Sequence, residues 1–462
     1  MALFGTAGIR GSVRTDVTPE LAVAVGRAVG RDATSETAAA RESEVVVGRD
    51  GRTTGGGLAA AVEAGVRSGG ASVRRLGVVP TPALAFASRG RHGVMLTASH
   101  NPPGDNGIKC FVDGVEYDRD RERVIEERVA ADPETDPDAA PVAWDAWGDG
   151  HEESVLDAYR AAVADYAQGY GAPLDGCPVA VDCGNGVGAL ATPTILRDLG
   201  ASVETLEGNV DGHFPGRESK PTPDSLATLR RFVADGDAAF GIAHDGDADR
   251  IVIVDSGGET VHEDTVLAIV AERYVRASDA ADPVVVTTPN ASARIDERVA
   301  AAGGRVERVR LGALHEGVAR VRGTGTVVFA AEPWKHIHPA FGGWIDAVAS
   351  AAVFARHVAA EGLAALREPI TERPYRKVSV PCPDNAKADA MAELRTTLPE
   401  AFPAASVDTV HGVRLERPDG SWLLVRPSGT EPYVRLYAES ESVEELVANA
   451  RAVVEEAVEA TA

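Results

Sequence analysis

A strand–helix–strand pattern occurs three times in the chain and limits the folds that it can adopt. The three copies cover residues 45–76, 179–206 and 283–309. Each copy starts with an apolar, β-branched run, continues into a helix-like stretch that ends at a glycine, and closes with a second short strand. Glycine suits the left-handed residue that ends many helices. Short apolar strands that alternate with helices indicate βαβ units and therefore largely parallel sheets.

A further apolar strand follows each copy and leads into a polar loop. These strands are expected at 94–97, 239–243 and 327–330. In open α/β sheets, ligands bind at the loops that follow the carboxyl ends of the strands. The topology therefore suggests that the three loops meet in one cleft.

The last part of the chain has a different pattern. It contains a strand, a helix, several short strands and a closing helix, which predicts a smaller α+β domain. We expect three similar α/β domains with mixed, mostly parallel sheets, followed by this one. The expected domain ranges are 1–150, 151–255, 256–368 and 369–462.

The charge balance excludes some classes of partner. The chain has 46 basic and 70 acidic residues, which give a formal net charge of −24. Such a charge repels nucleic acid and anionic membranes, so we expect neither as a partner. Only five of the basic residues are lysine. An acidic chain with so little lysine suggests a halophilic, high-salt cytosol, in which ions screen the self-repulsion.

Export and membrane insertion are not expected either. No apolar run approaches the roughly 20 residues that cross a bilayer. Residues 1–11 contain glycine and arginine where a secretory signal has its apolar core. The four cysteines are scattered, without metal-ligand spacing or a disulfide pattern. We therefore expect a cytoplasmic protein with reduced cysteines.

The first motif that carries chemistry is Thr-Ala-Ser-His-Asn-Pro at 97–102. Ser99 precedes His100 on a loop after a strand, where a serine beside an imidazole can act as a nucleophile with an adjacent base. The alternative is a plain turn, because the Asn-Pro pair is typical of turns. Lys109 follows shortly afterwards and adds a nearby cation.

The second motif is Asp-Gly-Asp-Ala-Asp-Arg at 245–250. Its carboxylates belong to Asp245, Asp247 and Asp249. Three hard oxygen ligands in one short loop suit Mg²⁺, whereas the alternative is a solvated acidic loop. An EF-hand is excluded because Ser256 stands where that loop needs glutamate. Arg250 adds a cation that can hold a phosphate with two hydrogen bonds.

Three further motifs are less specific. Arg-Pro-Ser-Gly-Thr-Glu-Pro at 426–432, with Arg435 after it, is either a phosphate cradle or a polar turn. Phe-Gly-Thr-Ala-Gly-Ile-Arg-Gly at 4–11 is glycine-rich but lacks the spacing of P-loops and dinucleotide-binding loops. Ala-Glu-Pro-Trp-Lys-His-Ile-His at 331–338 places a carboxylate, an ammonium and imidazoles in the third loop, where the alternative is an interdomain contact.

Together, these motifs resemble those of the α-D-phosphohexomutase superfamily in its archaeal-type form, which includes phosphoglucomutase, phosphomannomutase and phosphoglucosamine mutase. The family has a phosphoserine loop T-A-S-H-N-P, a metal loop D-G-D-A/G-D-R and a phosphate loop R-x-S-G-T-E-P. The chain has these loops in the same order, and residues 4–11 match the family's F-G-T-x-G-x-R-G. The resemblance covers nearly the whole chain and implies three Rossmann-like α/β domains plus a smaller, phosphate-binding C-terminal domain.

The resemblance implies an isomerase of the phosphotransferase type that interconverts sugar 1-phosphate and 6-phosphate. A phosphoserine at Ser99 and a bisphosphorylated intermediate would carry the phosphoryl group, with hexose 1,6-bisphosphate as activator. One Mg²⁺ per chain would be held by Ser99, Asp245, Asp247 and Asp249. The C-terminal domain would close and reopen during turnover.

The resemblance also assigns roles to individual residues. The catalytic set is Ser99, His100, Lys109, Arg10 and Arg250, with His100 and Lys109 both candidates for acid–base work. The substrate-binding set is Glu332, Lys335, His336, Arg426, Ser428, Gly429, Thr430 and Arg435.

The sugar-selecting loop departs from the family pattern. That loop usually contains G-E-x-S-G-H, whereas residues 331–336 are Ala-Glu-Pro-Trp-Lys-His. We expect a phosphoglucosamine, phosphomannose or phosphoglucose substrate, and residues 105–109 are slightly more similar to the phosphoglucosamine mutases. A phosphopentomutase of the same fold, a metal-dependent sugar-phosphate phosphatase and a non-enzymatic sugar-phosphate sensor stay open. The sequence does not predict the oligomeric state.

Overall fold

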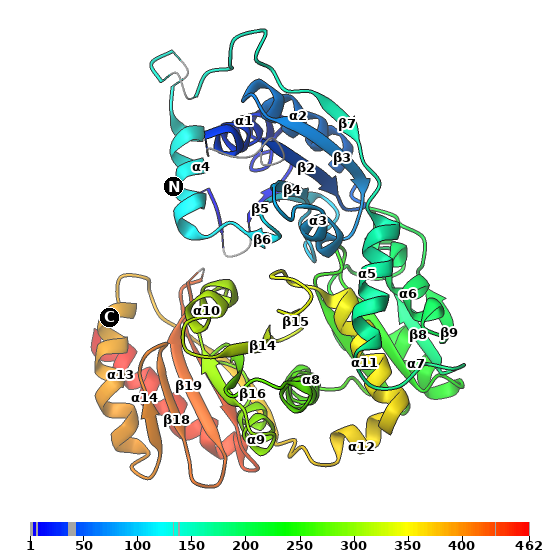
Figure 1. Cartoon of the computed structure of the whole chain (residues 1–462). Coiled ribbons are helices and arrows are strands. Elements are labelled where there is room, and N and C mark those ends of the chain that lie inside the picture. Colours follow the sequence, from blue (N-terminus) through cyan, green and yellow to red (C-terminus); the bar gives the residue numbers. More distant parts are fainter. Residues whose placement is uncertain are drawn as a thin grey trace. The chain divides into compact units, whose positions relative to one another are not determined.

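The computed structural model describes residues 3–5, 8–35, 43–132, 134–136, 139–429 and 431–461. The chain forms two compact units (Figure 1). The first unit comprises Met1–Val266 and Trp334–Leu366, and the second comprises Leu267–Pro333 and Arg367–Ala462. Among the described residues, no helix has the combined length and apolar character that a membrane crossing requires.

A seven-stranded mixed sheet opens the first unit. Its strands are β1 (Ile9–Ser12), β2 (Glu44–Arg49), β3 (Ser72–Val78), β4 (His92–Leu96), β5 (Asp105–Val112), β6 (Val115–Glu116) and β7 (Gly150–Glu152). Their order is β1-β5-β4-β2-β3-β7, with β6 paired to β5. The neighbours β4, β2, β3 and β7 run parallel, whereas β5 is antiparallel to β1, β4 and β6.

Four helices belong to this sheet: α1 (Pro19–Ser35), α2 (Gly55–Ser68), α3 (Thr81–Ala87) and α4 (Arg119–Ala130). Helices α1 and α2 approach each other closely through glycines. A Cβ atom on Gly26 would lie 2.3 Å from the carbonyl oxygen of Val62, and one on Gly65 would lie 2.2 Å from that of Val23. Any larger residue at either position would therefore force the two helices apart.

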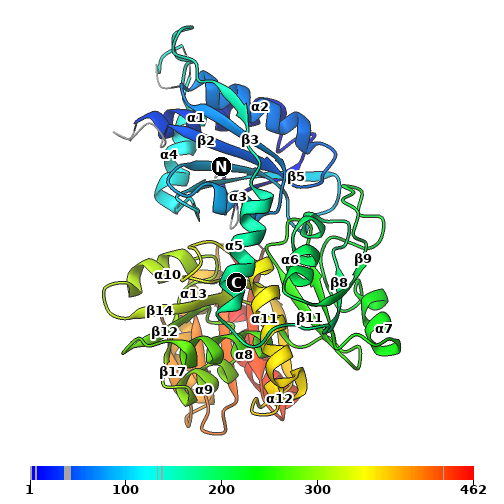
Figure 2. The same cartoon turned by 45° about the vertical axis from the view of Figure 1, so that its right-hand side comes forward.

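The second sheet of this unit contains β8 (Pro178–Asp182), β9 (Ser202–Leu206), β10 (Phe240–His244) and β11 (Ile251–Asp255), in the order β11-β10-β8-β9. Strand β8 is parallel to β9 and β10, and β11 is antiparallel to β10. The associated helices are α5 (Leu156–Gln168), the 3₁₀ turn η1 (Val187–Leu190), α6 (Thr192–Asp198), α7 (Ala227–Asp235) and α11 (Ala347–Glu361). Figure 2 shows the green strands β8, β9 and β11 with α6 and α7. Most of the α11 side chains are buried.

The second unit contains a parallel sheet and an antiparallel sheet. In the first, β12 (Pro283–Thr287) lies between β13 (Arg305–Arg308) and β14 (Thr326–Glu332). Its helices are α8 (Glu263–Ala277), which starts in the first unit, α9 (Ala293–Ala301) and α10 (Leu314–Val321). The short strand β15 (Lys335–Ile337) and helix α12 (Leu363–Arg367) follow later in the chain.

The antiparallel sheet is built from β16 (Tyr375–Pro381), β17 (Ser406–Asp408), β18 (Val413–Glu416), β19 (Trp422–Pro427) and β20 (Tyr433–Glu439), in the order β16-β20-β19-β18-β17. Helices α13 (Lys387–Ala401) and α14 (Val443–Thr461) share one apolar core with it. A buried ion pair between Arg294 of α9 and Glu439 of β20, 3.2 Å long, joins the two sheet regions of this unit.

The structure confirms the predicted fold class of α/β sheets followed by a smaller α+β region. The three strand–helix–strand copies appear as β2-α2-β3, β8-α6-β9 and β12-α9-β13, and the first and last strands of each copy pair in parallel. Our pattern did not predict the antiparallel strands β1, β5 and β11, which give the first two sheets their mixed character. The ranges of the four domains stay a prediction.

Candidate active site

Ser99 lies on the loop that follows β4, in a backbone conformation that only a constrained loop holds. Its φ of +51° is in the left-handed region, which non-glycine residues seldom adopt. The Ser99 amide donates to Thr97 Oγ1 at 2.8 Å, and the Thr97 hydroxyl donates to Asp50 Oδ2 at 2.8 Å. Such strain often accompanies function, and here it fixes the direction of the serine hydroxyl.

Arg52 holds the rest of this loop and was missed by the sequence analysis. It is fully buried, and its Nε atom pairs with Asp50 at 3.1 Å. Its two terminal nitrogens donate to four loop carbonyl oxygens at 2.6–3.0 Å, those of Ser99, Asn101, Pro102 and Asp105. A buried guanidinium needs this many acceptors, and the planar fork supplies five donors to match them. The sequence feature that could have identified Arg52 is its place in the loop after the carboxyl end of β2, where ligands of α/β sheets bind.

The three aspartates of the second motif lie on the tight loop between β10 and β11, whose antiparallel pairing folds the chain back on itself. Gly246 makes the approach to the serine loop possible, because a Cβ atom there would lie 2.6 Å from the Ser99 carbonyl oxygen. The Ser99 hydroxyl donates to Asp245 Oδ2 at 2.6 Å. Two motifs that are 146 residues apart in the sequence therefore meet at one hydroxyl.

Buried cations surround the aspartates. Lys109, from β5, donates to Asp249 Oδ2 at 2.9 Å and to Asp247 Oδ2 at 3.3 Å. Lys335, the first residue of β15, lies 3.2 Å from the same Asp249 oxygen. Arg250 Nε lies 3.8 Å from both Asp245 and Asp249. The sequence motifs predicted Lys109 as a catalytic residue of this site, whereas they predicted that Lys335 binds the sugar substrate.

The charges at this site shift the pKa values of its groups strongly. Burial alone would lower the pKa of Lys109, but Asp247, Asp249 and Glu116 raise it above its usual value. Burial and the other two carboxylates raise the pKa of Asp245 to about 8. The pKa of Asp249 is held well below its usual range because Lys109, Lys335 and Arg250 outweigh its burial. The site therefore contains both positively and negatively charged side chains, which are buried and shielded from water.

The aspartate triplet fits a divalent cation. One oxygen from each of the three carboxylates lies within 4.8 Å of the others. Among the described side chains, Asp247 Oδ1 and Asp249 Oδ1 are buried and have no hydrogen-bond partner. Buried carboxylate oxygens need a donor or a cation. An all-oxygen donor set of this kind suits Mg²⁺.

Thr81 supports the triplet from the start of α3, and no motif in the sequence points to it. Its hydroxyl donates to Asp247 Oδ2 at 2.7 Å, and its amide donates to the Asp247 carbonyl oxygen at 3.0 Å. The two bonds fix both the side chain and the backbone of Asp247.

His100 and Arg10 complete the group of predicted catalytic residues that the first unit brings together. His100 Nδ1 lies 3.3 Å from the Ser99 hydroxyl oxygen. Burial, Arg250 and Arg10 lower the pKa of His100 to about 3, so its imidazole is neutral. In the described part of the chain, Arg10 Nε and Nη2 are buried without a hydrogen-bond acceptor. Unsatisfied guanidinium donors beside a serine suit an anionic ligand such as a phosphate.

The sugar-recognition motif also contains His336 and Glu332. His336 is buried, and its Nδ1 atom lies 3.1 Å from Ser350 Oγ on α11. Burial lowers the pKa of His336 to about 3, as expected for a neutral core histidine. Glu332 is the last residue of β14 and belongs to the second unit.

The predicted phosphate loop lies in the second unit, between β19 and β20. Arg426 donates to the Tyr437 hydroxyl at 2.9 Å and to the Pro427 carbonyl oxygen at 3.1 Å. Its Nε atom is buried and lacks a partner among the described residues. Ser428 is buried, Gly429 is exposed, and Thr430 lies outside the described residues.

Two further cations shape this loop. Arg435 pairs with Glu431 of the loop and donates to Ser379 Oγ at 3.1 Å. Lys387, which the sequence analysis did not select, donates to the carbonyl oxygens of Ser428 at 2.8 Å and Glu431 at 2.6 Å. Lys387 is the first residue of α13, and only the folded arrangement reveals its role.

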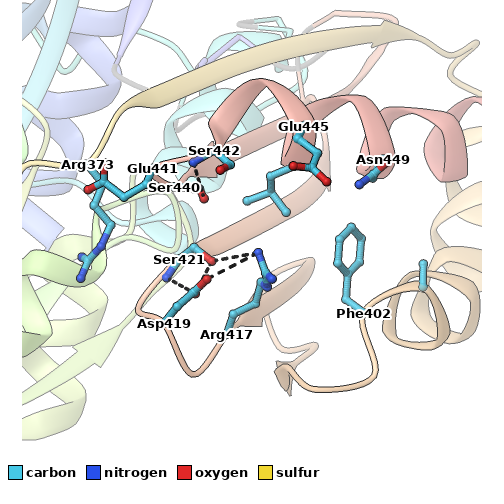
Figure 3. A pocket seen from close by; sticks show the side chains of 12 residues that line it. Arg373, Phe402, Arg417, Asp419, Ser421, Ser440, Glu441, Ser442, Glu445 and Asn449 are labelled. Carbon is cyan, nitrogen blue, oxygen red and sulfur yellow. Dashed lines mark hydrogen bonds and ion pairs between the residues drawn. The ribbon is translucent and has the colours of Figure 1, made fainter.

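A separate cavity of about 380 Å³ lies elsewhere in the second unit (Figure 3). It is bordered by Arg417, Asp419 and Ser421 on one side and by Ser442 and Glu445 of the α14 region on the other. It includes none of the predicted site residues. Its charged groups are mixed in sign, and Arg417 is already 3.7 Å from Asp419.

The chain is similar to several known proteins. Family models describing phosphoglucomutase/phosphomannomutase α/β/α domains I and II and the C-terminal domain match residues 1–136, 158–258 and 378–456. A phosphopentomutase from Thermococcus kodakarensis is 40% identical over 446 residues, covering 95% of this chain and 94% of the relative. A probable phosphoglucosamine mutase from Methanopyrus kandleri is 41% identical over 451 residues, with coverages of 96% and 94%.

Solved structures share the fold. A phosphoglucomutase/phosphomannomutase family protein from Burkholderia thailandensis has a TM-score of 0.84 at 24% identity, covering 100% of this chain and 97% of that one. An N-acetylphosphoglucosamine mutase from Aspergillus fumigatus, in complex with GlcNAc-6P and magnesium, has a TM-score of 0.65 at 17% identity, with coverages of 100% and 96%. The chain therefore belongs to the phosphoglucomutase/phosphomannomutase family of phosphosugar mutases.

Proposed function

We propose that this mutase moves a phosphoryl group between Ser99 and a sugar, and so interconverts sugar 1-phosphate and sugar 6-phosphate. One observation carries the proposal: the Ser99 hydroxyl lies 2.6 Å from Asp245, within a buried triplet of carboxylates that has unsatisfied oxygens. A simple polar turn would not bury its serine against three aspartates. The resting enzyme would carry phosphate on Ser99, and a bisphosphorylated sugar would be the intermediate.

One Mg²⁺ per chain would be held by Asp245, Asp247, Asp249 and an oxygen on Ser99. When bound, the ion would withdraw charge from the phosphoryl group, which is the main requirement of phosphoryl transfer. The unsatisfied Asp247 and Asp249 oxygens support this donor set. Thr81 would keep Asp247 in place during turnover.

Arg10 and Arg250 would bind the phosphate on Ser99, because both carry buried guanidinium nitrogens without a hydrogen-bond partner among the described residues. For acid–base work on the sugar hydroxyl, the two candidates differ in charge. His100 is neutral and can accept a proton, whereas Lys109 is held as a cation by Asp247 and Asp249. We assign charge stabilisation to Lys109. A pKa of about 3 makes the His100 imidazole a weak base, so both residues stay candidates for the acid–base group.

The phosphate that does not react would be held by the loop in the second unit. Arg426, Ser428, Gly429, Thr430 and Arg435 would supply its donors, and Glu332 would select the sugar through its hydroxyl groups. Arg426 supports this role with a buried nitrogen that lacks a partner in the described part of the chain.

For the sugar itself, we propose a hexose, with glucosamine phosphate placed first and mannose and glucose phosphates next. The relatives named as a probable phosphoglucosamine mutase and as a phosphopentomutase are 41% and 40% identical to this chain. Sequence identity therefore does not decide between glucosamine phosphate and pentose phosphate as the substrate. A pentose phosphate is therefore the second candidate. Hexose 1,6-bisphosphate would activate the enzyme by phosphorylating Ser99.

The test is a panel of 1-phosphates of glucosamine, mannose, glucose and ribose, each assayed with Mg²⁺ for its 6- or 5-phosphate. We expect conversion of a hexose phosphate, stimulation by the matching 1,6-bisphosphate, and no net release of inorganic phosphate. Stoichiometric phosphate release without isomerisation would instead show a phosphatase. Glu332→Ala would change the ranking of the sugars, and Glu361→Ala, on α11, is the matched control.

A further inference from the structure

We propose that Lys335 is a positioning residue of the aspartate triplet, and that its ammonium group sets how tightly the triplet binds a divalent cation. This inference rests on the proposed function, because it concerns the metal site of the same mutase. It departs from the sugar-binding role that the sequence pattern implies for Lys335.

The first observation is the place of the ammonium. Lys335 Nζ lies 3.2 Å from Asp249 Oδ2, and the two side chains are 9% and 1% exposed. Lys109 Nζ lies 2.9 Å from the same oxygen. One buried carboxylate oxygen therefore faces two ammonium groups, while its partner, Asp249 Oδ1, has no hydrogen bond among the described residues. A side chain that served only the sugar would not have to be buried against this aspartate.

The second observation is that the backbone fixes Lys335 from both sides. On one side, Trp334 has a φ of +71°, and its carbonyl oxygen accepts a hydrogen bond from the Ile251 amide at 3.1 Å. On the other side, the His336 carbonyl oxygen accepts one from the Asp346 amide at 2.8 Å. The first contact ties Lys335 to β11, the strand that leaves the aspartate loop, and the second ties it to Asp346, the N-cap residue of α11.

The Trp334 ring adds a further link to the loop. The guanidinium of Arg250 lies 5.7 Å from the centre of the ring. Trp334 and Lys335 together replace the Ser-Gly pair of the usual family pattern, so an aromatic ring and a cation both face the aspartate loop in this chain. The replacement thus changes the surroundings of the metal-binding residues.

The effect on a metal ion follows from the charges. A fixed ammonium beside Asp249 repels a dication and competes with it for the Asp249 oxygen. Lys335 therefore weakens metal binding, while it keeps the triplet neutral enough to stay folded without the ion. Removal of its charge must tighten the binding of the ion.

The test compares Mg²⁺ binding by calorimetry in the full-length protein and in three variants, without sugar phosphate. All samples need the same phosphorylation state at Ser99, checked by mass spectrometry. We expect Lys335→Met to lower the Kd for Mg²⁺ at least about fivefold. Lys335→Arg keeps the charge and should stay within about twofold of the unaltered protein. Lys220→Met removes an exposed lysine of the same unit and should change nothing.

Lys335→Gln serves as a second neutral variant, because it keeps a hydrogen-bond donor if the methionine variant does not fold. Unchanged or weaker Mg²⁺ binding in a folded neutral variant overturns the proposal. A raised KM for the sugar phosphate with an unaltered Kd for Mg²⁺ would instead support a sugar-binding role for Lys335. Because the titration needs no turnover, it is informative even if the proposed mutase activity is absent, which the sugar-phosphate panel shows separately.

Discussion

The two regions that we propose to bind phosphate differ in burial and in the partners of their cations. In the first unit, Ser99 and the three aspartates are at most 1% exposed and are held by hydrogen bonds from several strands and loops. In the second unit, the loop between β19 and β20 has an exposed glycine at its centre. Its Arg426 is half-buried and bonds only to Tyr437 and Pro427 of its own sheet among the described residues.

In the proposed mechanism, the first region makes and breaks bonds to phosphorus and the second holds a phosphate that does not react. Charges that develop during transfer are stabilised best by groups that are fixed in advance and shielded from water. The proposed loop has to bind whichever phosphate does not react, in each of two sugar orientations, so weaker contacts near its surface suit it. Changes in the first region should therefore act on kcat, and changes in the second should act on KM.

Among changes to the residues around Ser99, the largest effect is expected for Asp247→Asn. This change removes one charge from the triplet and keeps the shape of the side chain, so kcat should fall at least about a hundredfold while the fold is retained. Turnover measured over a range of Mg²⁺ concentrations, with circular dichroism as the check on folding, tests the expectation. Asp211→Asn, at a more exposed position, is the control. Near-normal turnover at every Mg²⁺ concentration would refute the metal assignment.

Arg52→Lys should have the next largest effect, although Arg52 need not contact the substrate. Lysine cannot reach the four carbonyl oxygens that the planar guanidinium satisfies. We expect kcat to fall about tenfold or more with little change in KM, and the free energy of unfolding to fall by about 2 kcal/mol. Arg49→Lys, at the end of β2, is the matched control. A change in KM alone would mean that Arg52 does not position Ser99.

Arg426→Gln tests the second region. The loss of a charged donor to the phosphate should raise the KM for the sugar phosphate about tenfold and leave kcat within about threefold. Steady-state kinetics on the preferred substrate give both values. Arg417→Gln removes an arginine that directly follows β18, outside the phosphate loop, and should have no effect. A fall in kcat without a change in KM would break the contrast between the two regions.

The smallest effect is expected for Glu431→Gln. Glu431 pairs with Arg435, and this pair must open if Arg435 is to bind phosphate. Because exposed ion pairs are weak, the change should lower KM by no more than about threefold. Glu441→Gln is a control outside the loop. If KM rose instead, Glu431 would assist ligand binding rather than compete with it.

The sequence predicted most of the parallel strands, because their short apolar runs repeat three times with a glycine after each helix. It also predicted that Ser99 and Asp245 follow strands, and the structure places both at carboxyl ends of parallel strand pairs. The antiparallel strand β5, which carries Lys109, was not predicted as a strand, because its pairing depends on distant partners. The local sequence pattern does not show which segment will pair with the open edge of a β-sheet.

The supporting residues were harder to predict because burial is a property of the folded chain. Nothing local in the sequence distinguishes Arg52 or Thr81. Arg52 finds its carbonyl acceptors on the segment between β4 and β5 of its own sheet, and Thr81 finds its carboxylate acceptor on the loop after β10 of the second sheet. For His336 and Lys335, the family pattern implied the sugar. The structure instead buries His336 against Ser350 and places Lys335 on Asp249.

The central claim is that the hydroxyl of Ser99 carries the phosphoryl group between the two positions of the sugar. The most direct measurement is peptide mass spectrometry after incubation with Mg²⁺ and hexose 1,6-bisphosphate labelled with ³²P. We predict label on the peptide that contains Ser99, its loss when unlabelled sugar monophosphate is added, and neither label nor turnover in Ser99→Ala. Label on another residue, or full turnover in Ser99→Ala, would contradict the account.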